Sequence, residues 1–198
     1  GTFNMTNDSG LFLTRAELIQ QGYKPALLNR WQNAQGTVAV PLYEGKMVQM
    51  FDHRAADVVM NTENLHRAAQ QAAIEENEKA QPDRFPTPQF WVNRTDASSV
   101  TSFDYSIAYK SITAPTNMRT LIGGLMPECG VGNSMAMLVA TDPERKKEVI
   151  PLLLANISSL PFDYVLRQKV QGQNLNWYII EQLPVITPER FQQSIGNT

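Results

Sequence analysis

Prolines interrupt this chain at intervals that leave little room for long regular elements. Pro41 follows a short strand pattern at 37–40, three prolines crowd residues 82–88, and Pro184 follows an apolar run. A proline lacks the amide hydrogen that helices and sheets use, so each one favours an end, an edge or a kink. We therefore expect short strands and short helices, with Pro41 closing its strand.

Several segments carry the signals of short helices. Thr14 and Glu17 have the spacing of a capping box, in which each side chain bonds the backbone amide of the other residue, and Gly22 follows as a stop. Ser159 is a second helix cap. Helices are accordingly expected over residues 15–21, 42–51, 61–80, 142–159, 159–170 and 187–193.

Strand patterns lie between these helices. The expected strands cover residues 37–40, 90–93, 103–112, 119–127, 134–140 and 175–185. The fourth and fifth are expected to pair across a hairpin turn that contains Gly130 and Gly132, because glycine tolerates the positive φ of such turns. Mixed strands and helices predict an α+β (mixed α/β) fold in one compact domain over residues 1–198.

Charge and cysteine content narrow the classes of function. The net charge is −2 and the isoelectric point is about 5.7, so the chain lacks an overall basic character, although an acidic domain can still present a basic face. The single cysteine, Cys129, rules out an internal disulfide and fits a reducing cytoplasm. With only two histidines besides, a zinc site is not expected. No apolar run is long enough to suggest a membrane as partner.

Residues 40–54 raise the question of catalysis. Glu44-Gly45-Lys46 has the spacing of half of a metal-dependent nuclease motif, but no upstream acid has the context that the other half requires. We interpret it as the solvated face of the expected helix 42–51, whose inward side chains are Tyr43, Met47, Met50 and Phe51. Cys129 lies far in sequence from both histidines. No catalytic residue and no metal site is predicted.

Four blocks of sequence carry a resemblance to a known family. In order, they are "NMTNDSGLFLTRAEL", "PLYEGKMVQMFDHR", "TNMRTLIGGLMPECGVGNSMAML" and "LLANISSLPFDYVLRQKVQGQNLNWYIIEQLPV". Together they resemble the C-terminal target-recognition region of adenine-specific DNA methyltransferases of type IIG and type ISP restriction-modification and related phage-defence systems. The last block departs from the family pattern, which has a second glycine and a Thr-His pair where this chain has Gln171 and Gln173-Asn174. No base contact is therefore carried over to that loop.

The resemblance implies that DNA recognition and methylation lie in separate domains. In such enzymes this region is similar to a target-recognition domain that reads double-stranded DNA, while a preceding methyltransferase domain binds S-adenosylmethionine and methylates adenine at N6. The chain contains neither an Asn-Pro-Pro-Tyr or Asp-Pro-Pro-Tyr tetrapeptide nor a Phe-x-Gly-x-Gly cofactor loop. We expect a catalytically inert C-terminal fragment of a bacterial, cytoplasmic enzyme. Its expected partners are DNA and the methyltransferase domain of the same parent, with no cofactor of its own.

Side chains suited to DNA contact gather in a few places. Arg, Lys, Asn and Gln read base edges, and small polar donors hold phosphates. The densest set lies at a predicted helix end and the loop after it: Arg167, Gln168, Lys169, Gln171, Gln173, Asn174 and Asn176. A second set lies between two predicted strands: Tyr109, Lys110, Thr113, Thr116, Asn117 and Arg119. Two further candidates are Asn133 and Ser134.

His53 and Arg54 are candidates of a different kind. They follow the expected helix 42–51 directly in sequence. They can contact phosphate, dock the chain onto the methyltransferase domain, or act as cations that favourably meet the dipole of a helix end. The sequence leaves these three roles open.

Two other functions also stay open from the sequence. A protein-interaction or scaffolding module would pack on the methyltransferase domain without reading bases, and the acidic isoelectric point favours it. A stand-alone metal-dependent nuclease rests on Glu44 and Lys46 alone. We expect Glu44→Ala to leave any DNA cleavage by the parent enzyme intact, which a cleavage assay would check. Loss of cleavage in that variant would revive the nuclease hypothesis.

Overall fold

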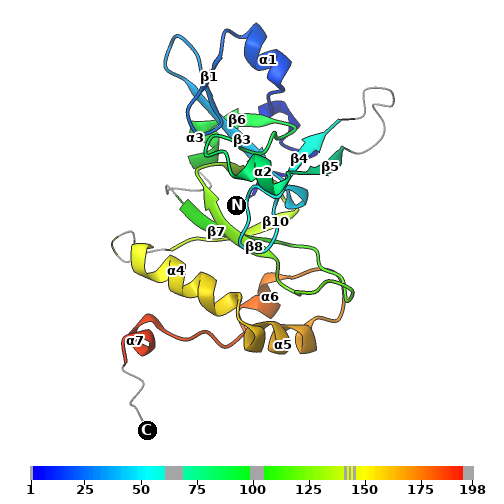
Figure 1. The fold of residues 1–198 in the computed structure, drawn as a ribbon, viewed down its shortest axis with the longest axis vertical. Coiled ribbons are helices and arrows are strands. Elements are labelled where there is room, and N and C mark those ends of the chain that lie inside the picture. The colour runs from blue at the N-terminus through cyan, green and yellow to red at the C-terminus, as the bar shows by residue number, and fades with distance from the viewer. Residues whose placement is uncertain are drawn as a thin grey trace.

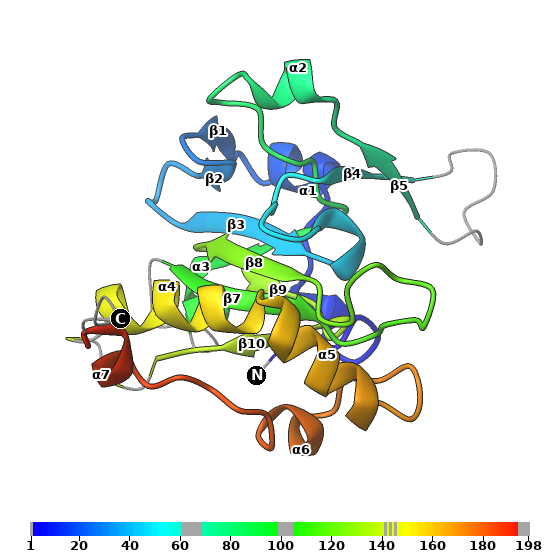
Figure 2. The ribbon, with the colours of Figure 1, turned by 60° about the horizontal axis from the view of Figure 1, so that its bottom comes forward.

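Figures 1 and 2 show the fold in a computed structural model, which describes residues 2–60, 69–98, 105–140, 142, 144 and 146–193. Helices combine with mostly antiparallel sheets, which confirms the α+β class expected from the sequence. Along the long axis of Figure 1, a first sheet is followed by a second sheet and then by a layer of helices.

The first sheet comes from the N-terminal half of the chain plus one later strand. Its order is β1-β2-β3-β6 with antiparallel pairs, and β9 pairs with β3 in parallel. These strands are β1 (Lys24–Ala26), β2 (Arg30–Gln32), β3 (Val38–Tyr43), β6 (Trp91–Asn93) and β9 (Gly130–Val131). A separate two-stranded sheet pairs β4 (Ala56–Val59) with β5 (Gln70–Ala73).

The middle strand of the second sheet joins two hydrophobic cores. β7 (Tyr105–Lys110) lies between β8 (Gly123–Pro127) and β10 (Met135–Leu138). Ile107 and Tyr109 belong to the core formed with the C-terminal helices, whereas Ala108 belongs to the core beside the first sheet. This alternation follows from the two-residue period of a strand.

Most helices are short. They are α1 (Arg15–Gln20), α2 (Glu76–Lys79), α3 (Arg94–Ser98), α4 (Lys146–Ile157), α5 (Leu160–Lys169), α6 (Trp177–Ile180) and α7 (Pro188–Phe191), with 3₁₀ turns η1 (Ser9–Leu11) and η2 (Gly45–Met47). Two predicted caps are confirmed. Thr14 and Glu17 form the capping box of α1, and the Ser159 hydroxyl accepts the amide of Phe162 at the start of α5.

α4 and α5 are the longest helices of the described residues. No single helix there is long and apolar enough to cross a membrane. Lys147–Ile157 and Leu160–Lys169 together have the length and composition of a span, but the two segments meet at a bend of 66°.

Pro41 lies inside a strand rather than at its end, contrary to the expectation. β3 continues to Tyr43, and Pro41 faces Trp91 of β6. The backbone N–H and C=O of Trp91 both bond to Leu13, at 2.8 Å each. Since Trp91 directs its backbone groups away from β3, the pair does not need an amide hydrogen from Pro41.

The prediction of a helix over residues 42–51 is wrong. After β3 the chain makes η2 and then a turn at 49–52, which is closed by two backbone hydrogen bonds of 2.8 and 3.0 Å. Phe51 adopts a left-handed φ of +62°, and its amide donates to the carbonyl of Gly123. Of the four side chains expected to face inward, Tyr43 and Met47 are buried, Met50 is half-buried and Phe51 is 61% exposed.

Three other elements differ from expectation. β8 and β10 do not pair with each other, since β7 lies between them. Residues 175–185 contain α6 instead of a strand. Of the helix expected over 61–80, residues 61–68 lie outside the described part of the chain, Gln70–Ala73 is β5, and Glu76–Lys79 is helical.

Gly130 and Gly132 are not the positive-φ residues of a hairpin turn. Within the described residues, the glycines with positive φ are Gly22 and Gly36. Gly130 lies in β9, where a Cβ atom would be only 2.7 Å from Cγ2 of Val92. Glycine is required there by close packing between strands, not by turn geometry.

Gly123→Ala is expected to reduce the free energy of unfolding by about 1–3 kcal/mol through overpacking. A Cβ atom at this position would lie 2.5 Å from the carbonyl oxygen of Ala108 and 2.8 Å from Cβ of Tyr109. Gly10→Ala is the control, because its Cβ would meet no atom within 4 Å. Urea unfolding measures both variants. Equal stability would contradict the pairing of β7 with β8.

Arg84 holds the proline-rich connection to β4 through Asp57. Its Nη2 and Nη1 donate to the two carboxylate oxygens at 2.6 and 3.1 Å, and the amide of Thr87 donates to Oδ1 at 2.7 Å. Partial burial opposes the charge of Asp57, but the hydrogen bonds from Arg84 and Thr87 outweigh it and lower the pKa of this carboxyl.

Asp57→Asn is expected to cost about 1–3 kcal/mol of unfolding free energy at neutral pH. Because the pKa of Asp57 is lowered on folding, its contribution is complete above the unfolded pKa and disappears as pH falls through the folded pKa. Urea unfolding should therefore show the difference from wild type shrinking as the pH falls below about 4, the pKa of an unfolded aspartate. Asp83→Asn, at an exposed position of the same connection, is the control. A difference that stays constant with pH would contradict the ion pair.

Candidate nucleic-acid interface

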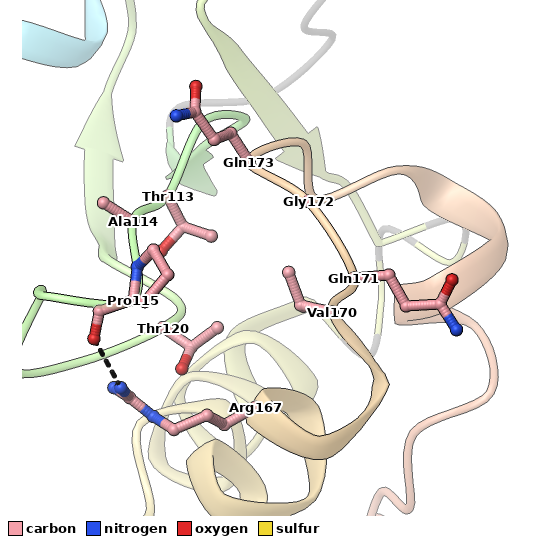
Figure 3. A pocket seen from close by; sticks show the side chains of 9 residues that line it. All are labelled: Thr113, Ala114, Pro115, Thr120, Arg167, Val170, Gln171, Gly172 and Gln173. Carbon is pink, nitrogen blue, oxygen red and sulfur yellow. Dashed lines mark hydrogen bonds between the residues drawn. The ribbon is translucent and has the colours of Figure 1, made fainter.

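The two predicted polar sets meet in the structure. The loop 111–120, between β7 and β8, lies beside the loop 170–176, which follows α5 (Figures 1 and 3). Two backbone hydrogen bonds join the loops: the amide of Thr113 donates to Gln173 at 2.7 Å, and the amide of Leu175 donates to Ser111 at 2.8 Å. Residues far apart in the sequence therefore share one surface.

Arg167, in the last turn of α5, clamps the loop 111–120 to the helix. Its Nη1 donates to the carbonyl of Pro115 at 3.1 Å. Its Nη2 donates to the carbonyls of Asn117 and Met118, at 3.0 and 3.4 Å. A guanidinium that bonds three carbonyls of one loop fixes the path of that loop. The N–H donors of Arg167 are therefore directed at the protein itself.

Asp163 and Arg119 fasten the far end of the same loop. Asp163 is buried, and its Oδ1 accepts the amide of Thr120 at 2.6 Å. Nη2 of Arg119 donates to the carbonyl of Ser158, just before α5, at 3.0 Å. The loop is thus braced in its middle and at its end by α5 and the residues that lead into it.

Two hollows lie at the contact between the loops. The Arg167 hollow has a volume of about 330 Å³ and is lined by Thr113, Ala114, Pro115, Thr120, Arg167, Val170, Gln171, Gly172 and Gln173 (Figure 3). The Met118 hollow has a volume of about 670 Å³. It shares Thr113, Ala114 and Gln173 with the first and adds Gln49, Met50, Lys110, Ile112, Asn117, Met118, Arg119 and Ile122.

The loop 170–176 presents amide side chains to solvent. The exposed ones are Gln171, Gln173, Asn174 and Asn176. Figure 3 shows Gln173 next to Thr113 and Ala114, whereas Gln171 points away from the loop 111–120. Gly172 between them has no atom within 4 Å of a Cβ position, so this part of the loop stands clear of the protein.

The other members of the two sets differ in exposure. Tyr109 is 1% exposed, so it has no surface for a DNA contact, and burial raises the pKa of its hydroxyl. Lys110 is half-buried at the Met118 hollow, and burial lowers its pKa. The exposed members are Thr116, Gln168 and Lys169, and the half-buried ones are Asn117, Arg119 and Arg167. Among the further candidates, Asn133 is exposed, and Ser134 Oγ accepts the amide of Gly45 at 2.9 Å.

His53 and Arg54 follow a turn, so their interpretation as cations at a helix end is wrong. The ring of His53 lies 6.5 Å from that of Tyr43. Burial and then the charge of Arg54 lower the pKa of His53, which favours the neutral imidazole. Nη1 of Arg54 donates to the carbonyls of Gln81 and Arg84, at 3.4 Å each. The guanidinium of Arg54 is therefore already hydrogen-bonded within the protein, whereas His53 makes a ring contact with Tyr43.

Glu44 and Lys46 do not form the solvated helical face that we expected. Glu44 is 8% exposed, its Oε2 lies 3.0 Å from Nζ of Lys46, and Lys46 also donates to the carbonyl of Ala69. The structure brings no group of three or more His, Cys, Asp or Glu side chains into metal-binding range within its described residues. Glu44 and Lys46 thus form a partly buried ion pair, without further carboxylates grouped around it in the described part of the chain.

Sequence reasoning missed Asp163 and Thr120, which define the end of the loop. The spacing of Asp163 and Arg167 by one helical turn signals an ion pair on α5, and Oδ2 of Asp163 lies 3.6 Å from Nη2 of Arg167. Nothing local in the sequence shows that both residues also bond a loop from the second sheet.

Comparison of the chain with protein-family models, curated proteins and solved structures finds no match.

Arg167→Ala is expected to loosen the loop 111–120. The loss removes three hydrogen bonds to carbonyl groups that water can reach, at a cost of about 0.5–1.5 kcal/mol. The amides of Thr113 and Thr120 should then exchange with solvent faster, which hydrogen exchange measures. Lys169→Ala, an exposed position on the same helix, is the control. Equal exchange in the two variants would contradict the clamp.

Proposed function

We propose that this chain is the sequence-specific DNA-recognition domain of an N6-adenine DNA methyltransferase of the restriction-modification type. The observation that carries the proposal is the meeting of the polar loops 111–120 and 170–176 on one braced surface. Recognition groups usually lie on loops that a rigid scaffold positions. The resemblance of four sequence blocks to the target-recognition region of such enzymes supports the same function.

The amide side chains of the two loops suit base edges. An amide donates and accepts hydrogen bonds at once, so Asn and Gln can pair with adenine through two bonds in the major groove. Gln171, Gln173 and Asn174 are exposed on one loop, and Asn117 lies at the Met118 hollow on the other. We assign base reading to these four residues.

The basic side chains of the surface have two different roles in this proposal. Lys169 is exposed and Lys110 is half-buried, and both can approach phosphates. Arg167 instead acts as a positioning residue, because its guanidinium bonds the loop carbonyls. With a net charge of −2, the chain would leave part of the phosphate neutralisation to its parent enzyme.

In this proposal, cofactor binding and catalysis belong to the parent enzyme. A methyltransferase domain outside this chain would bind S-adenosylmethionine, turn the target adenine out of the duplex and methylate it. Such an enzyme acts in the bacterial cytoplasm. The burial of Cys129, which raises the pKa of its thiol, is compatible with a chain that carries no reactive group.

A second candidate function has an observation of its own. Four large apolar side chains are more than half exposed on α5 and α6, namely Leu160, Tyr164, Trp177 and Tyr178. Such side chains are common in protein–protein interfaces. A scaffolding module would use them to pack on the methyltransferase domain without reading bases.

Lys169→Ala is expected to weaken the binding of this chain to every duplex sequence. Because one phosphate contact is lost, the slope of log K against log salt should fall by about 1. Fluorescence anisotropy with a mixed-sequence duplex measures both quantities. Lys24→Ala is the control, since Lys24 is exposed on β1 at the end of the molecule opposite α5 (Figure 1). Absence of duplex binding at low salt, or equal effects of the two variants, would overturn the proposal.

Gln173→Ala is expected to change which sequences the chain prefers. Loss of a base-reading amide costs about 1–3 kcal/mol of discrimination at one position, while phosphate contacts persist. Sequencing of duplexes selected from a random library measures this preference. Gln21→Ala, at an exposed position beside α1, serves as the matched control. An unchanged preference in Gln173→Ala would contradict base reading and favour the scaffolding function.

A further inference from the structure

Met118 is the most exposed large apolar side chain among the described residues. It is 96% exposed and belongs to the loop 111–120. A free chain gains nothing from holding an apolar side chain fully in water. Single exposed apolar side chains are common on protein surfaces, so it is the position of Met118, on the braced loop beside the Met118 hollow, that indicates a partner.

Hydrogen bonds from two arginine side chains hold the backbone around Met118. Arg167 bonds the carbonyls of Asn117 and of Met118 itself, and Arg119 bonds the carbonyl of Ser158. Met118 is therefore presented from a braced position, so a partner need not order the loop when it binds.

The surroundings of Met118 combine apolar surface with groups that suit nucleic acid. Ile112, which lines the Met118 hollow, is 56% exposed. The same hollow is lined by Lys110 and by the amides of Asn117 and Gln173. A cation and two amides beside an exposed apolar side chain match a partner that has phosphates, base edges and the apolar faces of stacked bases.

We propose that Met118 is a wedge that enters between adjacent base pairs of a DNA duplex. This inference rests on the proposed DNA-recognition function and adds deformation of the duplex to it. Apolar side chains, including methionine, that enter a base step partly unstack it and bend the duplex. The braced loop supplies the stiffness that a wedge needs, and Ile112 lines the same hollow as Met118.

The unwinding of DNA by this chain tests the wedge. A nicked plasmid is closed by ligase at low salt with a saturating amount of the chain, and the linking number of the product is measured. A wedge separates and unwinds the base pairs that it enters, so wild type should lower the linking number. The variants are Met118→Ala, which removes the wedge, and Met118→Leu, which keeps an apolar side chain of similar size. Leu27→Ala is the matched control, because Leu27 is 87% exposed next to β1.

We expect Met118→Ala to lose the unwinding and to bind duplex DNA at least several-fold more weakly. Met118→Leu and Leu27→Ala should behave as wild type. If wild type and Met118→Ala bind and unwind DNA equally, or if wild type binds without unwinding, the wedge is overturned while DNA recognition stands. If wild type binds no duplex at low salt, the proposed function fails and the wedge falls with it.

Discussion

The bonds from α5 to the loop 111–120 are the constraint on which the candidate site depends. Arg167 holds the middle of that loop and Asp163 holds its end, so a segment without a core of its own keeps one path. The backbone pairing of Thr113 with Gln173 then aligns the second loop against it. A helix that packs on one face of the second sheet thereby sets the geometry of a surface built from two distant segments.

β7 provides the rigid support for this arrangement. Its alternate side chains enter two different cores, so the strand cannot shift without disturbing both. The loop 111–120 leaves directly from the end of β7, and β8 receives it through the tightly packed Gly123. The positions of the polar residues on the two loops thus depend on the packing of β7 beneath them as well as on the hydrogen bonds from α5.

The sequence predicted local features better than long-range pairings. The cap at Thr14 and the cap at Ser159 depend on neighbouring residues alone, and both are confirmed. Pro41 was misplaced because its tolerance within β3 depends on Trp91, whose backbone bonds Leu13. For the candidate site, composition indicated the two polar sets. Only the fold shows that the two sets meet, and that the donors of Arg167 are used to hold the loop 111–120.

Hydrogen exchange of the chain, with and without duplex DNA, tests the central claim most directly, because that claim concerns two loops acting as one surface. The account predicts that saturating duplex slows exchange in both loops, 111–120 and 170–176, and leaves β1 and β2 unchanged. Protection of one loop without the other, or bound DNA that protects neither, would contradict it.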